Sequence, residues 1–474
     1  MGKFRKTKIV CTIGPACANE DVLTKMCLAG MNVARLNFSH GTYETHQKYI
    51  DLIKSVREKL NLPIAIMLDT KGPEYRIGTF ENGSVELQDG DVFVFTTDEI
   101  VGTREKVSVS YKNLPNDLKI NDKILVNNGL VVFQVINITG NDIHCKTIIG
   151  GKLSNNKSMS FPGKVLSQKY LSEQDKNDIL FGLKNDIDFI ACSFVSCKQN
   201  LLDIQKLLDE NNNPHVELIA KIENRAGVDN IAEICEACDG IMVARGDLGV
   251  EIPFVEVPAV QKNLLTKCRL LGKRAVTATE MLESMTHNPR PTRAEISDVA
   301  NAIYDGTSAI MLSGETAAGD YPVEAVQTMA DIARETEKNI DYSKWHKETN
   351  FVIKNMLDAI SHATCGMSID IHANAITVCS LSGKTARMVS RFRPPADILG
   401  LTVNQTTWRK LALSWGVTPV LCDVYPSTEV LFFFAKNMAQ ETFNLQPGDK
   451  IVLTGGIVNG QSGNTNTVKI EVIE

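Results

Sequence analysis

The stretch His215-Val-Glu-Leu-Ile-Ala-Lys-Ile-Glu-Asn224 begins as an apolar run and ends in a lysine, a carboxylate and an amide. The next run, Gly240-Ile-Met-Val-Ala244, is followed in the same way by Arg245-Gly246-Asp247. A buried strand with polar groups at its carboxyl end is typical of a parallel α/β barrel, whose sites lie at that face. A lysine beside two carboxylates suits a divalent metal ion and a phosphoryl group. These two segments therefore predict a metal and phosphate site at a barrel mouth.

Six further apolar runs share this design, and helical patterns separate them. They are Lys8–Ile13, Asn32–Asn37, Ile64–Asp69, Asp188–Cys192, Ala275–Ala278 and Ser308–Leu312. Eight strands that alternate with helices predict the α/β class and a closed (β/α)8 TIM barrel. Because a pattern alone does not prove closure, an open doubly wound sheet is the alternative.

Two regions depart from the barrel rhythm. Residues 72–166 show short alternating runs and turn signals such as Asn82-Gly83 without a helical pattern, which predicts an inserted small β-barrel or sandwich. From residue 341 the alternation restarts on a smaller scale, after a linker at Asp341–Trp345. We therefore expect a barrel from 1–71 and 167–340, an inserted β-domain at 72–166 and a C-terminal α/β domain at 341–474. The last domain should have strands at Ala375–Cys379, Ile398–Thr402, Val417–Leu421, Lys450–Leu453 and Val468–Ile473.

Composition narrows the functional class. The 474 residues exceed one core, and 43% apolar with 22% charged residues is ordinary for a soluble globular protein. A net charge of −6 argues against a nucleic-acid binder or a polybasic membrane binder. No apolar stretch reaches membrane-spanning length, and the basic start at Met1–Lys6 lacks the apolar core of a secretory signal.

Twelve scattered cysteines, several of them inside apolar runs, indicate reduced thiols in a cytoplasmic protein. Cys235 and Cys238 have the spacing of a redox or zinc motif. Since no second pair or histidine lies at ligand spacing, we interpret this pair as structural.

The predicted mouth gathers charged groups from neighbouring strand ends. Glu223 and Asp247 could hold Mg²⁺ or Mn²⁺, with waters and substrate oxygens completing the shell; ordinary ion pairs are the alternative. Lys221 shares a strand face with Glu223, because strand side chains repeat every second residue, and could neutralise a phosphoryl group.

The second and third strands add further candidates. Arg35 and Asn37 share one face, and an arginine near carboxylates indicates a phosphate ligand, unless it merely pairs with a core carboxylate. Asp69 and Thr70, with Asn37 and Ser39, offer four oxygen donors with little charge. That set suits a monovalent cation, although such residues also cap turns.

The last domain offers a possible anion pocket. Residues 380–385 lie between a predicted strand and helix, where hydroxyls, a glycine and a helix N-terminus favour an anion. Val378 excludes a Walker A loop, and a plain N-cap turn is the alternative. The glycine-rich segment 454–460 could form the opposite wall.

Taken together, seven segments in this order resemble the pyruvate kinase family over nearly the whole chain. They are Lys8–Pro15, Asn32–Gly41, Leu68–Glu74, Ile219–Asn224, Val243–Gly249, Thr277–Glu283 and Asn288–Glu295. The resemblance implies transfer of phosphate from phosphoenolpyruvate to ADP, giving pyruvate and ATP, by a glycolytic homotetramer with Mg²⁺ and K⁺. It makes residues 72–166 a lid and residues 341–474 a regulatory domain. With the sequence ending at Glu474, we expect the extra C-terminal domain of some bacterial members to be absent.

The resemblance also assigns roles to individual residues. It implies that Lys221 stabilises the phosphoryl group, Arg35 binds the substrate phosphate, and Thr279 lies beside the methylene carbon that is protonated. Gly246 contacts substrate through its backbone, and Glu223 and Asp247 bind Mg²⁺. The remaining assignments are K⁺ at Asn37, Ser39, Asp69 and Thr70, nucleotide at Asn37, His40, Arg76 and Lys157, and effector at Ser380, Leu381, Ser382, Gly383, Lys384 and Thr385.

Three features qualify the resemblance. Glu74 stands where potassium-dependent members have glutamate, which predicts a K⁺ requirement. Ser160-Phe-Pro-Gly163 replaces the more usual Asn-Leu-Pro-Gly, which leaves one lid contact open. Basic and tryptophan residues for a second effector phosphate are not evident after Thr454, so we expect a phosphosugar or nucleotide effector bound mainly by residues 380–385.

Two other functions stay open on the sequence. One is a different barrel enzyme of pyruvate or phosphoenolpyruvate, such as an aldolase or mutase. The other is a catalytically inactive metabolite sensor that uses the last domain.

Overall fold

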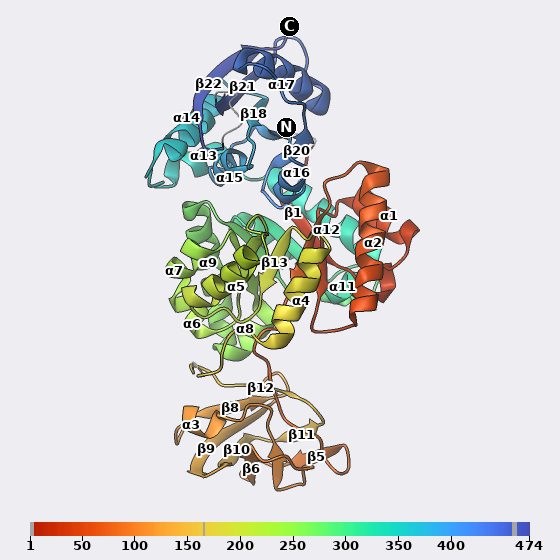
Figure 1. The fold of residues 1–474 in the computed structure, drawn as a ribbon, viewed down its shortest axis with the longest axis vertical. Coiled ribbons are helices and arrows are strands. Elements are labelled where there is room, and N and C mark those ends of the chain that lie inside the picture. Colours follow the sequence, from red (N-terminus) through yellow and green to blue (C-terminus); the bar gives the residue numbers. More distant parts are fainter. Residues whose placement is uncertain (1–3, 165, 457–461) are drawn as a thin grey trace.

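The chain forms three bodies stacked along one long axis, with the barrel in the middle (Figure 1). The structure is a computed structural model that describes residues 4–164, 166–456 and 462–474. The C-terminal domain lies at one end of the barrel and the inserted β-domain at the other (Figure 1).

The central body is a closed eight-stranded parallel barrel, which confirms the prediction of a TIM barrel and excludes the open sheet. Its strand order is β1-β17-β16-β15-β14-β13-β3-β2. The strands are β1 (Lys8–Thr12), β2 (Val33–Asn37), β3 (Ala65–Asp69), β13 (Phe189–Cys192), β14 (Glu217–Ile222), β15 (Gly240–Ala244), β16 (Arg274–Ala278) and β17 (Ala309–Leu312).

Helices surround the barrel and bury its outer face. They are α1 (Glu20–Ala29), α2 (Tyr43–Leu60), α4 (Glu173–Lys184), α5 (Lys198–Glu210), α6 (Arg225–Asp229), α7 (Ile231–Ala237), α8 (Arg245–Glu251), α9 (Val257–Leu271), α10 (Arg293–Tyr304), α11 (Gly314–Ala317) and α12 (Pro322–Lys338). Short 3-10 turns occur at Pro15–Cys17, Phe254–Glu256 and Glu283–Thr286.

Local sequence explains where several of these helices begin. Thr292 accepts a hydrogen bond from the Glu295 backbone N–H, and the Glu295 carboxylate accepts from Thr292 N–H in return, so α10 starts with a capping box. Ser172 caps α4 through the Asp175 N–H. Both side chains thus satisfy a backbone N–H of the first helical turn, which would otherwise have no partner within the helix.

The inserted domain is a seven-stranded sheet of order β4-β12-β8-β9-β10-β6-β7 with a separate ribbon of β11 and β5. A bridge between Ile77 and Val109 links the ends of its two edge strands, and Phe93, Phe95 and Phe133 fill the interior. One four-residue helix, α3 (Leu114–Asp117), lies where the sequence showed no helical pattern. The strands are β4 (Tyr75–Arg76), β5 (Ser84–Leu87), β6 (Val92–Thr96), β7 (Lys106–Ser108), β8 (Lys123–Val126), β9 (Val131–Thr139), β10 (Asp142–Ile149), β11 (Gly151–Ser154) and β12 (Ser158–Ser160).

The C-terminal domain has a five-stranded sheet of order β20-β19-β18-β21-β22, parallel except for the last pair. The expected linker is wrong in one respect, because Tyr342–Glu348 is the helix α13, capped by Asp341. The strands are β18 (Ala375–Cys379), β19 (Asp397–Thr402), β20 (Val417–Leu421), β21 (Lys450–Gly456) and β22 (Thr465–Val472), and the helices are α14 (Met356–Asp370), α15 (Lys384–Arg391), α16 (Gln405–Leu411) and α17 (Thr428–Phe443).

The amino ends of the barrel strands face the C-terminal domain. Lys8 Nζ donates to Val417 O, and Lys6 Nζ lies 3.1 Å from Asp397 Oδ1. The carboxyl ends therefore face the inserted domain, which places the predicted site between the barrel and that domain. Within the described ranges, no helix combines the length and apolar character needed to cross a membrane.

Candidate active site

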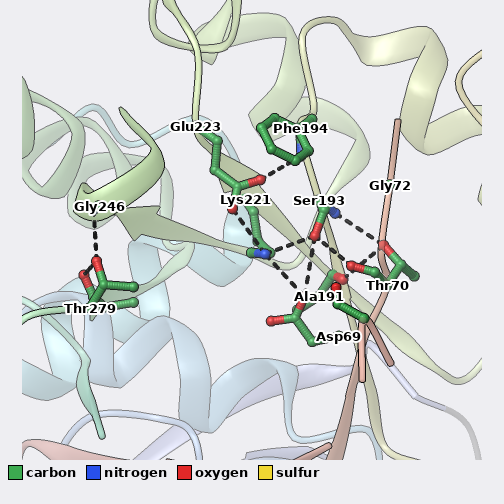
Figure 2. A network of polar contacts seen from close by, with 12 residues as sticks. Asp69, Thr70, Gly72, Ala191, Ser193, Phe194, Lys221, Glu223, Gly246 and Thr279 are labelled. Carbon is green, nitrogen blue, oxygen red and sulfur yellow. Dashed lines mark hydrogen bonds and ion pairs between the residues drawn. The ribbon is translucent and has the colours of Figure 1, made fainter. Parts of the chain in front are cut away.

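Lys221 is the centre of a buried polar network at the carboxyl ends of the strands (Figure 2). Its Nζ lies 2.9 Å from Glu223 Oε1 and 3.1 Å from Asp69 Oδ1, and donates to Ser193 Oγ at 2.7 Å. Lys221 is the second-last residue of β14, whereas the sequence pattern ended the apolar run one residue before it. The ammonium thus adjoins Glu223, as the sequence predicts, and also Asp69, which the sequence grouped with the K⁺ donors.

Burial and charge act against each other at this lysine. Burial alone would lower the pKa of Lys221, but Asp69 and Glu223 outweigh it and raise that pKa above its ordinary value. Burial likewise opposes ionisation of Asp69, yet Arg35 and Lys221 bring its pKa below the ordinary value. The cation and the Asp69 anion therefore keep each other charged.

Glu223 is buried, with 1% of its surface exposed. Its Oε2 accepts from Phe194 N–H at 2.6 Å. Burial and the nearby Asp247 carboxylate raise the pKa of Glu223 to about 7, against the effect of Lys221. Asp247 itself is exposed, and within the described residues it has no hydrogen bond or ion pair.

Glu223 and Asp247 are the two carboxylates that could bind a metal ion at the barrel mouth. No cluster of three or more histidine, cysteine, aspartate or glutamate side chains in the described ranges could hold a metal by itself. Two carboxylates suit Mg²⁺, which usually keeps waters and binds substrate oxygens in addition to one or two protein ligands.

Arg35 lies in β2 and is 8% exposed. Its Nε donates to Asp69 Oδ2 at 2.6 Å and its Nη1 to Thr12 Oγ1 at 2.8 Å. Arg35 thus pairs with a core carboxylate, as the alternative interpretation held, and also lines the cavity described below, as the phosphate interpretation requires. Both interpretations describe part of its environment.

The predicted K⁺ donors come together in pairs. Asn37 and Asp69 are register partners on β2 and β3, and Asn37 Oδ1 accepts from Ser39 N–H at 3.2 Å. Thr70 Oγ1 accepts from Ser193 N–H at 3.1 Å and donates to Ala191 O at 3.4 Å. Lys221, Ser193 and Arg35 occupy the Asp69 oxygens, so Asp69 has the most partners of the four.

A cavity of about 590 Å³ lies between the barrel mouth and the inserted domain. Ten of the residues singled out from the sequence line it: Arg35, Asn37, Ser39, His40, Glu74, Arg76, Lys157, Lys221, Glu223 and Asp247. Asp69, Thr70, Gly246 and Thr279 are not among its lining residues.

The side of the cavity formed by the inserted domain is also polar. Arg76 Nη1 donates to Asn156 O at 2.6 Å, and its guanidinium pairs with Glu74, which also lies 3.5 Å from Lys71 Nζ. His40 is exposed at the rim, and its carbonyl lies 2.8 Å from His46 Nε2.

Thr279 lies on the other side of Lys221 from the Asp69 group (Figure 2). Its Oγ1 accepts from Gly246 N–H at 2.8 Å and donates to Ala278 O at 2.6 Å. The loop after β16 and the first turn of α8 are joined by this contact, so the structure brings together the two sequence segments that carry Gly246 and Thr279.

Two polar residues of the site were not singled out from the sequence. Ser193 bridges Lys221, Asp69 and the Thr70 carbonyl, with Oγ donating to Thr70 O at 2.6 Å. It follows β13, so its place at a strand end was the available signal. Glu251, at the end of α8, lies beside Ser160 and Phe161 of the inserted domain, and burial raises its pKa to about 7. Ser160 and Phe161 also line the cavity described above, so the unusual Ser-Phe-Pro-Gly segment borders the candidate site.

The predicted effector segment borders a second cavity of about 350 Å³ in the C-terminal domain. Ser380 and Leu381 line it, whereas Ser382, Gly383, Lys384 and Thr385 do not. Ser382 Oγ accepts from Ser462 Oγ–H at 2.8 Å, and Gly383, with φ of +71°, is the N-cap of α15. Gly456 is part of the opposite wall; residues 457–460 of the expected wall lie outside the described residues.

Comparison with known proteins agrees with this arrangement. The family model "Pyruvate kinase, barrel domain" matches residues 4–326, and "Pyruvate kinase, alpha/beta domain" matches residues 358–471. A pyruvate kinase of Clostridium acetobutylicum is 46% identical over 99% of this chain and 100% of its own, and one of Bacillus licheniformis is 48% identical over 99% of this chain and 81% of its own.

Solved structures give the same result. The crystal structure of a pyruvate kinase from Cryptosporidium parvum matches with a TM-score of 0.94 and 37% identity, covering 99% of this chain and 96% of that one. With a closed barrel, an inserted sheet, a C-terminal α/β domain and these relatives, the chain belongs to the pyruvate kinase family of phosphotransferase enzymes.

Proposed function

We propose that this chain transfers the phosphoryl group of phosphoenolpyruvate to ADP, giving pyruvate and ATP, as a step of glycolysis. The observation that carries the proposal is the buried Lys221 ammonium, which is 2.9 Å from Glu223 and faces a cavity large enough for both substrates. A migrating phosphoryl group carries negative charge on its equatorial oxygens, so a fixed cation at this point stabilises the transition state.

Lys221 and Arg35 supply the permanent positive charge. Because Asp69 and Glu223 raise the pKa of Lys221, its ammonium is protonated at neutral pH. Arg35 is held by Asp69 and Thr12, which fixes its position before the substrate phosphate arrives.

Glu223 and Asp247 would hold Mg²⁺ or Mn²⁺. The Asp247 carboxylate, which has no partner among the residues that the structure describes, and the buried Glu223 oxygens are hard donors of the type that this ion prefers. When bound, the ion polarises phosphoryl and carbonyl oxygens as a Lewis acid. The Phe194 N–H and the Lys221 ammonium orient the Glu223 carboxylate for this role.

Asn37, Ser39, Asp69 and Thr70 would hold K⁺ beside the phosphate. Their proximity across β2 and β3 supports this set, and Glu74 on the cavity wall agrees with a K⁺-dependent member. We expect little turnover when tetramethylammonium replaces K⁺ at equal ionic strength. Full turnover in K⁺-free buffer would remove the K⁺ site from the proposal.

His40, Arg76 and Lys157, with Asn37, would bind the nucleotide across the rim of the cavity. The inserted domain, residues 72–166, would close over the mouth and exclude water from the transfer. Ser160 of the inserted domain and Glu251 at the end of α8 line the same cavity, which is where the lid approaches the barrel.

Thr279 would stand where the enolate methylene carbon receives its proton, and Gly246 would contact substrate through its backbone. The hydrogen bond between them fixes the Thr279 hydroxyl at the mouth. The proton itself would then reach the methylene carbon through this hydroxyl.

The C-terminal domain, residues 341–474, would bind a phosphorylated effector. The helix N-terminus at Gly383 and the hydroxyls of Ser380 and Ser382 are suitable for one phosphate, and Tyr425 with Leu431 supplies apolar wall for a sugar or base. A screen of phosphosugars and nucleoside monophosphates should find an activator that Ser382→Asp no longer responds to. If no such compound activates the enzyme, the proposed effector site is wrong.

The family also suggests a cytoplasmic homotetramer. All twelve cysteines are free in the described residues, and ten are buried, which agrees with a reducing compartment. Mass measurement by light scattering tests the tetramer directly.

A coupled assay with phosphoenolpyruvate and ADP tests the central proposal. Pyruvate formation that depends on both substrates and on Mg²⁺ supports it. Pyruvate formation without ADP would favour another barrel enzyme, and the absence of any turnover would favour a metabolite sensor.

A further inference from the structure

Thr279 and Glu280 both have a left-handed backbone, with φ of +67° and +53°. Thr279 is the only β-branched residue with positive φ in the described ranges. A β-branched residue is strained in this conformation, so neighbouring groups must hold it. Strain of this kind concentrates at functional sites.

The guanidinium of Arg245 is the group that holds this turn. Its Nη2 donates to Thr279 O at 2.7 Å and to Glu280 O at 3.1 Å. The left-handed turn points these consecutive carbonyls toward one side, where a single planar cation can satisfy both.

Asp298 in turn fixes the guanidinium. Arg245 Nη1 lies 2.8 Å from Asp298 Oδ1 and 2.6 Å from Oδ2. The Arg245 side chain is 11% exposed, whereas that of Asp298 is 37% exposed. Three elements therefore meet at Arg245: its own helix α8, the helix α10 and the loop after β16.

We propose that Arg245, fixed by Asp298, is a positioning residue that acts through Thr279. It holds the Thr279–Glu280 turn in the position where Thr279 Oγ1 accepts the hydrogen bond from Gly246 N–H. Gly246 is the residue after Arg245 in α8. The inference rests on the proposed role of Thr279 in proton delivery. It adds two residues, one of them on α10, that touch no substrate and yet set the direction of that hydroxyl.

The test is a double-mutant cycle between Arg245→Lys and Thr279→Val. Lysine keeps the charge but lacks the planar fork that places one nitrogen on the two carbonyls and the other on the carboxylate. Valine keeps the branched shape of threonine without the hydroxyl. The readouts are kcat and KM for phosphoenolpyruvate, and exchange of pyruvate methyl protons with D₂O in the presence of ATP, Mg²⁺ and K⁺.

We expect Arg245→Lys to lower kcat and methyl exchange together by roughly 10- to 100-fold, with KM within about twofold. The same substitution should have almost no further effect on the Thr279→Val background, because the hydroxyl that it positions is gone. Asp298→Asn should lower both rates less. Arg225→Lys, which alters another ion pair near the rim, with Glu256, is the matched control and should leave both rates unchanged.

The outcomes separate the inference from its premise. Additive effects in the cycle, or a silent Arg245→Lys beside an impaired Thr279→Val, would overturn the positioning role alone. A silent Thr279→Val would instead overturn the role of Thr279, and the inference with it. If Arg245→Lys and Asp298→Asn lower only the melting temperature, with kcat per folded enzyme intact, the pair is a structural link and the inference is wrong.

Discussion

Strand β14 has a buried charged network at each end, and the two networks are built differently. At its start, Glu217 is surrounded by Arg274, by Arg387 Nη1 at 3.7 Å and by Lys410 Nζ at 3.6 Å, and the C-terminal domain covers the cluster. Near its end, Lys221 faces carboxylates beside an open cavity. One carboxylate meets three cations at the first end, and one ammonium meets two carboxylates at the second.

The difference separates stability from function along a single strand. At the closed end every charge has protein partners, and the surrounding cations lower the pKa of Glu217 to about 2 although burial opposes this. At the open end Asp247 has no partner in the described residues, and Arg35 and Lys221 line the cavity. In TIM barrels the carboxyl-end face carries chemistry, and the opposite face serves stability.

Of these substitutions, Lys221→Met should have the largest effect on kcat. Removing the central cation should lower kcat by roughly 10³-fold or more, with little change in KM for phosphoenolpyruvate. Lys410→Met at the closed end is the control and should leave kcat within about twofold. Activity retained by the Lys221 variant in the coupled assay would remove this lysine from the mechanism.

Glu217→Gln, in contrast, should lower the stability of the protein and leave kcat nearly unchanged. Three cations would lose their shared carboxylate inside the interface, which costs about 3–5 kcal/mol when one partner of a buried pair is removed. We expect a clear fall in melting temperature, with kcat at 25 °C nearly unchanged. A fall in kcat with no loss of stability would show that the closed end takes part in catalysis.

The stability that Glu217 contributes at the closed end of β14 should depend on pH. Folding lowers the pKa of Glu217 from 4.5 to about 2, so the folded state binds this proton more weakly than the unfolded chain. The resulting stabilisation, about 3 kcal/mol, is complete above pH ~5 and is lost as the pH falls toward 2. The melting-temperature gap between wild type and Glu217→Gln should therefore narrow below about pH 4.5. A gap that stays constant down to pH 2.5 would contradict this.

Two serine substitutions give the smallest effects. Ser193→Ala removes the hydroxyl between Lys221 and Asp69 and should lower kcat by about tenfold, the value of about one hydrogen bond to a charged group. Ser414 accepts from Arg274 Nε at 3.1 Å at the closed end, so Ser414→Ala should cost about 1 kcal/mol of stability and leave kcat intact. Equal effects of both on kcat would erase the distinction between the ends.

Much of the fold was readable from the sequence, because strand ends have a local signature. The eight barrel strands were located within one or two residues, and Lys221, Glu223 and Asp247 were expected at one mouth. The small helix α3 and the helical linker α13 were missed, since both are short and their patterns weak.

Several polar partners of the site could not be found this way. Ser193 and Glu251 look like ordinary loop and helix-end residues until neighbouring strands and the inserted domain approach them. The effector segment was only partly placed, because the side chains that line a pocket depend on which way the helix start turns.

The sequence by itself determined the alternation of strands and helices, the insertion after β3 and the residue types at each strand end. These follow from local periodicity and turn chemistry, which the chain carries in every short segment. Only the tertiary structure decided that Asp69, Ser193 and Lys221 share one network and that Arg245 holds the Thr279 turn. Those contacts join residues far apart in the chain, and closure of the barrel is what brings them within bonding distance.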